Sequence, residues 1–384
     1  MCADISPFRI EIPQADLDDL HDRLVRTRSP YLVPGADTEW DHGIPSGYLH
    51  ELADYWADGF DWRAHEARLN TFPQFTTEID GQTIHFLHLR SPEPDATPLL
   101  LNHSYPTSFV EFLEASGPLT DPRAHGLDPA DAFHVVIPSL PGFAFSSPLS
   151  ARGWNLERTA LAFGELMTRL GYERFGVEGG DIGAGVTGRV TTLMPERVIG
   201  AHTHGDRLQL GMAGDGLPVP EGLSAEELAG LEAAQRSWGQ LKGYKVLHET
   251  MPNALAAGLA DSPVFQLAWI AEKFVQWAHP ATPISRENVL ITASLYWFTR
   301  TGPAAGDFYW ELAHADNPGW GGTNGVPMAS SVFYSDPLVR KVVGPAEGSG
   351  VFFREHGEGG HFPAFEVPDL FADDIRAFFR SLRA

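Results

Sequence analysis

The spacing of apolar positions divides the chain into a strand-rich part and two helical parts. Beyond residue 70, apolar and polar residues alternate over two runs separated by Asp80-Gly81-Gln82, which predicts a β-hairpin, because Asp-Gly between alternating runs favours a tight turn. Continuous apolar runs follow, as expected of strands that are buried on both faces. The strands predicted here are 75–79, 83–89, 98–103, 133–138 and 174–178, with a helix at 156–170. Strands alternating with helices predict an α/β fold with a mostly parallel sheet flanked by helices.

Helical spacing dominates at the N-terminus and again in the second half of the chain. Leu17, Leu20 and Leu24 belong to a predicted, mostly helical N-terminal extension over residues 1–70, which opens with a short strand at 8–12. The strand pattern is lost between residues 212 and 320, and a helical insertion at this point is typical of a lid over an active site. The helices predicted in this lid are 224–238, 264–277 and 289–298. The predicted α/β core, residues 71–211 and 321–384, regains strands at 326–328 and 350–353 and ends in a helix at 369–382.

Composition narrows the possible partners and compartments. The chain has 384 residues, of which 43% are hydrophobic, and a net charge of −23. Such an acidic chain is repelled by nucleic acid and by anionic membranes, so we expect neither as a partner. The single cysteine, Cys2, excludes an intramolecular disulfide and a cysteine-based zinc site. No signal peptide and no run of about 20 apolar residues is recognisable, which favours a cytoplasmic protein.

The most informative motif is Gly179-Gly180-Asp181-Ile182-Gly183, which follows the predicted strand 174–178. A strand, a tight turn of small residues and a helix together form a nucleophile elbow, in which small neighbours let the strand and the helix approach closely. The central residue here is Asp181 rather than Ser. A carboxylate nucleophile forms an ester with carbon, so it suits displacement at an sp3 carbon. A plain loop is the other interpretation of this pentapeptide.

A nucleophilic Asp requires a base that activates water and an acid that orients the base. His361 is the candidate base, because it lies in a flexible Gly359-Gly360 loop just ahead of the last helix. Asp336 is the candidate acid, since it follows the predicted strand 326–328 and precedes His361 by 25 residues. Glu355 and Glu358 compete for this role because they are nearer to His361 in sequence.

Backbone N–H groups are the expected donors for a developing oxyanion. One belongs to Ile182, directly after the candidate nucleophile. The other belongs to Tyr105, in the loop His103-Ser104-Tyr105-Pro106 that follows a buried strand. The sequence therefore predicts an oxyanion and substrate-binding site that includes His103, Tyr105, Pro106 and Ile182.

Taken together, these motifs resemble the α/β-hydrolase-fold epoxide hydrolases, in particular the microsomal-type branch with an N-terminal extension. The resemblance covers nearly the whole chain. It includes Trp40 and Phe60-Asp61-Trp62-Arg63 in the extension, the loop 103–106, Pro138-Ser139-Leu140-Pro141-Gly142-Phe143, the elbow 180–183, and Gly359-Gly360-His361-Phe362 with Glu366 and Pro368 beyond. Two positions depart from the pattern: Ser104 replaces a Gly, and Ile182 replaces the usual Trp. These departures bear on substrate size and selectivity more than on the reaction.

The resemblance implies a reaction and two further residues. In this family a pair of lid tyrosines donates hydrogen bonds to the epoxide oxygen, and Tyr244 and Tyr309 match those positions. An epoxide would be converted to a vicinal diol through a covalent ester on Asp181, without a metal or an organic cofactor. Some bacterial members act on aromatic or enediyne-type antibiotic precursors, and the Ala-, Gly- and Arg-rich composition is typical of a high-GC bacterium. The resemblance thus implies a bulky aryl or natural-product epoxide.

Other functions remain open at this point. A haloalkane-type dehalogenase also uses an Asp at the elbow, although Ile182 offers no side-chain donor for a halide. A catalytically silent α/β-hydrolase that binds a small ligand is a second alternative. A serine esterase is disfavoured, because no Gly-x-Ser-x-Gly motif stands at an elbow. The extension and the lid offer surfaces for a homodimer, and the sequence does not require one.

Overall fold

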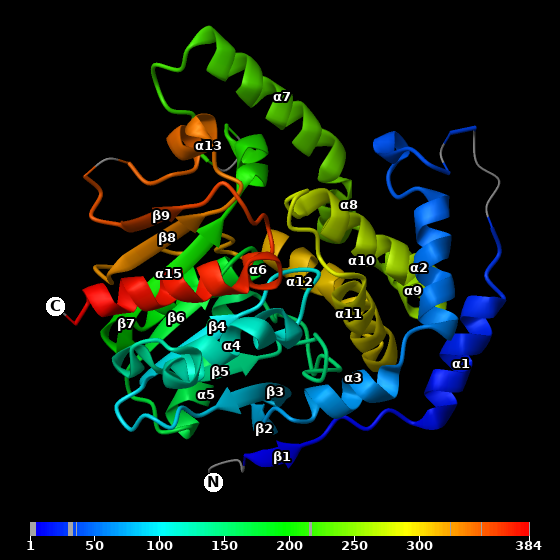
Figure 1. The fold of residues 1–384 in the computed structure, drawn as a ribbon, viewed down its shortest axis with the longest axis horizontal. Coiled ribbons are helices and arrows are strands. Elements are labelled where there is room, and N and C mark those ends of the chain that lie inside the picture. Colours follow the sequence, from blue (N-terminus) through cyan, green and yellow to red (C-terminus); the bar gives the residue numbers. More distant parts are fainter. Residues whose placement is uncertain are drawn as a thin grey trace.

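A computed structural model describes residues 5–29, 34–35, 37–214, 217–322, 324–346 and 348–383, so Cys2 lies outside the described residues. The described chain forms a nine-stranded sheet with the order β1-β2-β3-β5-β4-β6-β7-β8-β9 (Figure 1). Its strands are β1 (Ser6–Phe8), β2 (Gln74–Ile79), β3 (Gln82–Leu89), β4 (Thr97–Asn102), β5 (Phe133–Pro138), β6 (Phe175–Gly179), β7 (Val198–Gly205), β8 (Met328–Val332) and β9 (Phe352–Glu355). Strands β4 to β9 run parallel to one another, and β1, β2 and β3 add an antiparallel edge.

The antiparallel edge contains the predicted hairpin. Strands β2 and β3 pair in register from Gln74 opposite Leu87 to Ile79 opposite Gln82. Asp80 and Gly81 form the connection with φ values of 53° and 72°, the left-handed conformation that a two-residue turn between twisted strands requires. The predicted hairpin is therefore confirmed.

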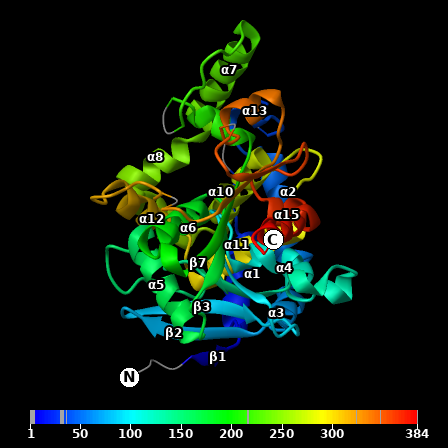
Figure 2. The same cartoon turned by 90° about the vertical axis from the view of Figure 1, so that its left-hand side faces the viewer.

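Helices cover both faces of the sheet, which confirms the predicted α/β-hydrolase architecture. Figure 2 shows the sheet between α5 (Leu156–Arg169) and α6 (Ile182–Leu193) on one side and α4 (Leu113–Thr120) and α15 (Pro368–Ser381) on the other. Each face has its own apolar core. Phe163 and Val186 pack against the sheet on the first side, and Phe371 and Ile375 do so on the second. Because both faces of the central strands are buried, their sequences are continuous apolar runs.

A group of helices lies over the carboxyl ends of the parallel strands, within the residues predicted as a lid (Figure 1). They are α7 (Ala225–Leu241), α8 (Gly243–Thr250), α9 (Pro252–Asp261), α10 (Pro263–Trp277), α11 (Arg286–Thr299) and α12 (Ala304–Ala313). Shorter helices α13 (Pro337–Val342) and α14 (Pro363–Glu366) follow later in the chain. In the described part of the chain no single helix is long and apolar enough to cross a membrane, and α9 and α10 reach that length only as a pair bent by 114°.

The extension contributes α1 (Gln14–Val25), α2 (Ser46–Asp58) and α3 (Trp62–Leu69), which lie beside the lid helices in Figure 1. Direct side-chain contacts join the two parts. Trp56 Nε1 donates to Ser294 Oγ at 2.9 Å, and the Tyr55 hydroxyl donates to Glu287 Oε1 at 2.7 Å. The extension therefore fixes the lid by hydrogen bonds as well as by apolar packing.

Several predicted strands are displaced or incomplete. The first strand is Ser6–Phe8 rather than 8–12, because the backbone N–H and C=O of Ile10 both pair with the Asn70 side chain instead of a strand. The strands predicted at 326–328 and 350–353 are found at Met328–Val332 and Phe352–Glu355. Strand β7 was not predicted at all, and it proves important for the active site.

Candidate active site

Asp181 stands at the elbow that the sequence predicts. It follows β6 and precedes α6, with φ 50° and ψ −126°, a strained conformation for a residue with a side chain. The turn leaves no room for side chains at its neighbours. A Cβ on Gly180 would lie 2.0 Å from His204 Nε2, and a Cβ on Gly183 would lie 2.0 Å from the Asn102 carbonyl oxygen. The small residues therefore let the elbow pack directly against β4 and β7.

The loop after β4 places a backbone donor on this carboxylate. The N–H of Tyr105 donates to Asp181 Oδ1 at 3.1 Å, as expected for one half of an oxyanion site. Ile182 is the first residue of α6, so its N–H belongs to the helix turn that has no acceptor within the helix. Pro106 follows Tyr105 through a cis peptide bond and is buried.

The first residue of that loop, His103, holds the backbone rather than facing substrate. Its Nδ1 lies 3.0 Å from the Ser104 carbonyl oxygen, and its Nε2 accepts from the N–H of Leu140 at 3.1 Å. Burial lowers the pKa of His103 to about 4, so the ring is neutral. Because both nitrogens are bonded to backbone groups, the expected substrate contact of His103 is wrong, and the residue instead fixes the loop.

Ser104, one of the two departures from the family pattern, points away from the nucleophile. Its hydroxyl lies 2.9 and 2.8 Å from the two carboxylate oxygens of Glu111, and its N–H donates to Glu111 Oε2 at 2.9 Å. Ser104 and Glu111 are both fully buried, and burial raises the pKa of Glu111. The added side chain therefore anchors the Tyr105 loop from behind and does not narrow the site.

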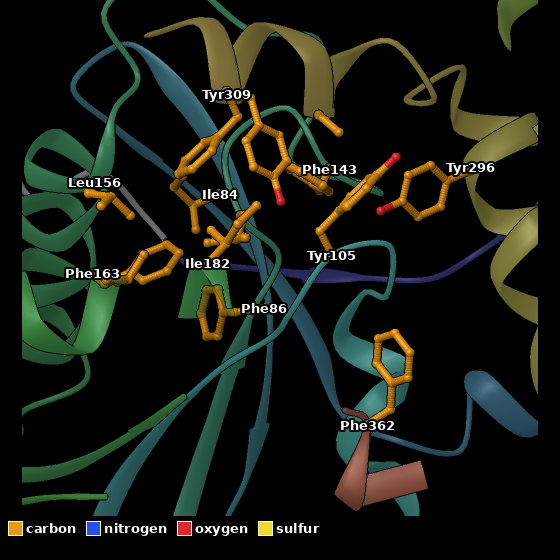
Figure 3. Packing of buried hydrophobic residues seen from close by; sticks show 14 of the residues in the cluster. Ile84, Phe86, Tyr105, Phe143, Leu156, Phe163, Ile182, Tyr296, Tyr309 and Phe362 are labelled. Carbon is orange, nitrogen blue, oxygen red and sulfur yellow. The ribbon is translucent and has the colours of Figure 1, made fainter. Parts of the chain in front are cut away.

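Ile182, the second departure, is also buried away from solvent. Figure 3 shows its side chain beside Ile84 and Phe86, with Tyr105 and Tyr309 nearby. Its exposed fraction is 3%. The side chain thus contributes to the core beneath the elbow.

His361 lies opposite the nucleophile, with its Nε2 3.7 Å from Asp181 Oδ2. Its Nδ1 bonds to Asp206 Oδ2 at 2.7 Å. Burial lowers the pKa of His361, but the charges of Asp206 and Asp181 outweigh burial and raise it to about 10. The imidazole therefore carries a proton at neutral pH.

The prediction that Asp336 orients His361 is wrong, because Asp206 occupies that position in the structure. Asp336 caps the N-terminus of α13, where its Oδ1 accepts from the N–H groups of Leu338 and Val339 at 2.8 and 2.9 Å, and its other oxygen pairs with Arg207. An Asp directly before a Pro at a helix start is a typical N-cap, and this local role holds the carboxylate away from His361. The competing Glu355 bonds to Ser335.

Asp206 was missed because its strand was missed. It directly follows β7, whose sequence contains His202 and His204 among apolar residues. These histidines read as polar, yet both are buried, with His202 bonded to Ser331 and His204 to Glu178. The available signal was the largely apolar run 198–201, followed by His202-Thr203-His204, a glycine and then the acidic Asp206.

The two lid tyrosines lie close to each other and to Tyr105, whose N–H binds the nucleophile. Tyr244 on α8 and Tyr309 on α12 are buried, with ring centroids 6.0 Å apart and an interplanar angle of 86°. The ring centroid of Tyr105 lies 6.0 Å from that of Tyr244 and 5.7 Å from that of Tyr309. Burial and then the charge of Asp181 raise the pKa of both hydroxyls, which therefore remain protonated hydrogen-bond donors. Among the described residues, no group of three or more His, Cys, Asp or Glu is arranged to hold a metal ion.

Comparisons with known proteins show the family of this chain. A sequence profile described as "Epoxide hydrolase N terminus" matches residues 5–112. A Stigmatella aurantiaca protein, whose name places it provisionally among epoxide hydrolases, is 42% identical over 99% of this chain and 86% of its own length. Epoxide hydrolase 1 of Sus scrofa is 32% identical over 97% of this chain and 88% of its own length. The Aspergillus niger epoxide hydrolase structure superposes with a TM-score of 0.83 at 34% identity, covering 99% of this chain and 97% of that one.

The parallel sheet, the elbow at Asp181 and the histidine facing it define an enzyme of the α/β-hydrolase fold. Within that fold, the full-length relatives decide the family. The chain belongs to the epoxide hydrolases.

Proposed function

We propose that this epoxide hydrolase opens its substrate through a covalent ester on Asp181. The position of the carboxylate supports the choice of nucleophile, because Oδ1 is bound by the Tyr105 N–H while Oδ2 faces the side of His361. In this mechanism Oδ2 attacks an epoxide carbon and Oδ1 becomes the ester carbonyl oxygen. The single observation that carries the proposal is the Asp181–His361–Asp206 arrangement at the elbow.

Ring opening leaves negative charge on the epoxide oxygen. Tyr244 and Tyr309 are the donors available to that oxygen, and their raised pKa values keep them protonated at neutral pH. A positioned phenol that donates to a developing alkoxide acts as a general acid, an effect typically worth about 10²–10⁴ in rate. The product of this step is a hydroxyalkyl ester on Asp181.

Formation of the ester also changes the charge around His361. The carboxylate of Asp181 is one of the groups that raise the pKa of this imidazole, and its charge disappears on esterification. The pKa of His361 then falls, so the ring can lose its proton and act as a base. The base is thereby activated only when an ester is present to be hydrolysed.

Hydrolysis completes the cycle. His361, oriented by Asp206, removes a proton from a water molecule that attacks the ester carbonyl carbon. The Tyr105 and Ile182 N–H groups stabilise the tetrahedral oxyanion, and loss of one such donor typically costs about 10²–10³ in rate. The ester C–O bond then breaks, and the departing alkoxide takes a proton from His361 to complete the vicinal diol. The carboxyl group of Asp181, which now holds one oxygen from water, returns its remaining proton to the imidazole.

The walls of the site favour an aromatic substrate. The rings of Tyr105, Tyr244 and Tyr309 contact one another beside the nucleophile that the Tyr105 N–H binds, and the Trp277 ring lies 5.2 Å from the Tyr244 ring. Such walls give an aryl group offset-stacked and edge-to-face contacts. We therefore propose a bulky aryl epoxide, of the kind found in natural-product antibiotic pathways.

The ester mechanism is tested with styrene oxide in ¹⁸O-labelled water under single-turnover conditions. The diol of the first turnover should carry unlabelled oxygen, because that oxygen comes from Asp181, and the label should appear in the peptide that contains Asp181. In His361→Gln the ester should accumulate and raise the protein mass by the mass of the substrate. Label in the first diol and none in the peptide would show direct attack by water, and halide release from a haloalkane would instead favour a dehalogenase.

A further inference from the structure

A buried histidine of the lid has no part in the reaction described above. His248 lies on α8, one helical turn after Tyr244, and is 1% exposed. Its ring centroid is 5.7 Å from Tyr105, 5.9 Å from Tyr244 and 5.5 Å from Tyr309. Tyr105 binds Asp181 through its N–H, and Tyr244 and Tyr309 are the lid tyrosines whose hydroxyl pKa values are raised by burial and then by the charge of Asp181. His248 thus forms part of the wall of the substrate site.

Neither ring nitrogen of His248 has a hydrogen-bond partner among the described residues. Two other fully buried histidines differ in this respect. His85 bonds through both nitrogens to Ser139 and Gln74, and His103 does so to Ser104 and Leu140. Buried polar groups of folded proteins are almost always hydrogen-bonded, because leaving them unpaired costs free energy. The unpaired ring of His248 therefore points to a ligand that supplies the bonds.

The chemistry of the ring defines that ligand. Burial, and then the charge of Lys273, lower the pKa of His248 to about 3, so the ring is neutral. A neutral imidazole offers one N–H donor and one nitrogen acceptor. Of common substituents on an epoxide, a hydroxyl group both donates and accepts. The surrounding rings, including Trp269 at 5.6 Å, suit the apolar part of the same molecule.

We propose that His248 is a specificity-determining residue that binds a hydroxyl group of the substrate, so that the preferred substrates are aryl epoxides with an alcohol close to the ring. This inference rests on the proposed function, because it places the alcohol in the same site as Asp181. The hydroxyl would occupy the lid side of the site, between His248 and the tyrosines, while the epoxide carbon faces the nucleophile.

Two substrates that differ by one oxygen test the proposal. In 3-phenylglycidol the epoxide carries a phenyl and a CH₂OH group, and in trans-β-methylstyrene oxide a methyl group replaces CH₂OH. We expect the wild-type enzyme to prefer the alcohol by about 10- to 100-fold in kcat/KM, because an analogue that lacks the hydroxyl leaves the polar groups of the site unpaired. In His248→Phe this ratio should fall towards one.

Controls separate recognition from folding. His314→Phe makes the same replacement at an exposed position of the lid and should keep the wild-type ratio. Where His248→Phe does not fold, His248→Asn provides a shorter polar replacement, and its ratio should also fall. A wild-type enzyme that hydrolyses the methyl compound without preferring the alcohol would overturn the proposal, as would an unchanged ratio in a folded His248 variant. Hydrolysis of neither compound would instead count against the proposed function itself.

Discussion

The imidazole of His361 is held by Asp206, whose Oδ2 lies 2.7 Å from Nδ1. Asp206 follows β7, whereas Asp336, the acid expected from the sequence, lies beyond the neighbouring strand β8. Both strands end at the same edge of the sheet, so either one could deliver a carboxylate to the histidine. The structure therefore assigns the orienting contact to a strand that the sequence pattern did not reveal.

Removal of the Asp206 carboxylate should impair catalysis far more than removal of the Asp336 carboxylate. We expect Asp206→Asn to lower kcat by about 10²–10⁴, because an amide favours the wrong tautomer and orientation of the base. Asp336→Asn should lower kcat only a few-fold, since Asn still caps a helix and the partly exposed pair with Arg207 contributes little. Steady-state kinetics with styrene oxide measures both. A greater loss in Asp336→Asn would return the orienting role to that residue.

The charge state of His361 should depend on both neighbouring carboxylates. Its pKa in the free enzyme should lie well above 6.5, near 10, and should fall in Asp181→Asn and again in Asp206→Asn. NMR titration of the imidazole resonances measures these values. A wild-type pKa near 6.5 would contradict the expected coupling.

The same pKa predicts how stability changes with pH. Because the folded-state pKa lies above the unfolded value, the contacts of protonated His361 stabilise the fold fully below about pH 6.5, and this stabilisation is lost as pH rises through about 10. The difference in unfolding free energy between the wild type and His361→Gln should therefore shrink over that range. Urea denaturation at several pH values tests this, and a difference that grows with pH would contradict the sign.

The Ser104 hydroxyl should matter for stability and not for substrate choice. In Ser104→Ala, Glu111 Oε1 loses its hydrogen bond while it remains buried, which should lower the unfolding free energy by about 1–3 kcal/mol. The ratio of kcat/KM between a small and a large epoxide should stay within about two-fold of the wild-type ratio, because the hydroxyl points away from the site. A marked shift of that ratio with unchanged stability would place Ser104 at the substrate.

The contact between the extension and the lid should be measurable as a coupling energy. Trp56 Nε1 and Ser294 Oγ form a buried hydrogen bond at 2.9 Å. A double-mutant cycle of Trp56→Phe and Ser294→Ala should yield about 0.5–1.5 kcal/mol of coupling in urea denaturation. Strictly additive effects would show that the bond contributes nothing to the attachment of the lid.

Local sequence patterns determined much of this enzyme. The Asp80-Gly81 turn predicted the hairpin, and continuous apolar runs predicted the buried strands that carry the active-site loops. The elbow glycines predicted the strained turn at Asp181, and a Cβ on Gly180 or Gly183 would indeed lie 2.0 Å from a neighbouring atom, which leaves room only for glycine. These features could be predicted because each depends on the chemistry of a few consecutive residues.

Other features were decided only by tertiary structure. Strand β7 is hidden in the sequence because His202 and His204 become core residues only through their partners on neighbouring strands. The choice between Asp206 and Asp336 depends on the direction in which each carboxylate points, and a helix cap directs Asp336 away from the histidine. The spacing of residues in the sequence likewise does not predict that His248 lies among three tyrosines, because α8, α12 and the loop after β4 meet only when the chain is folded.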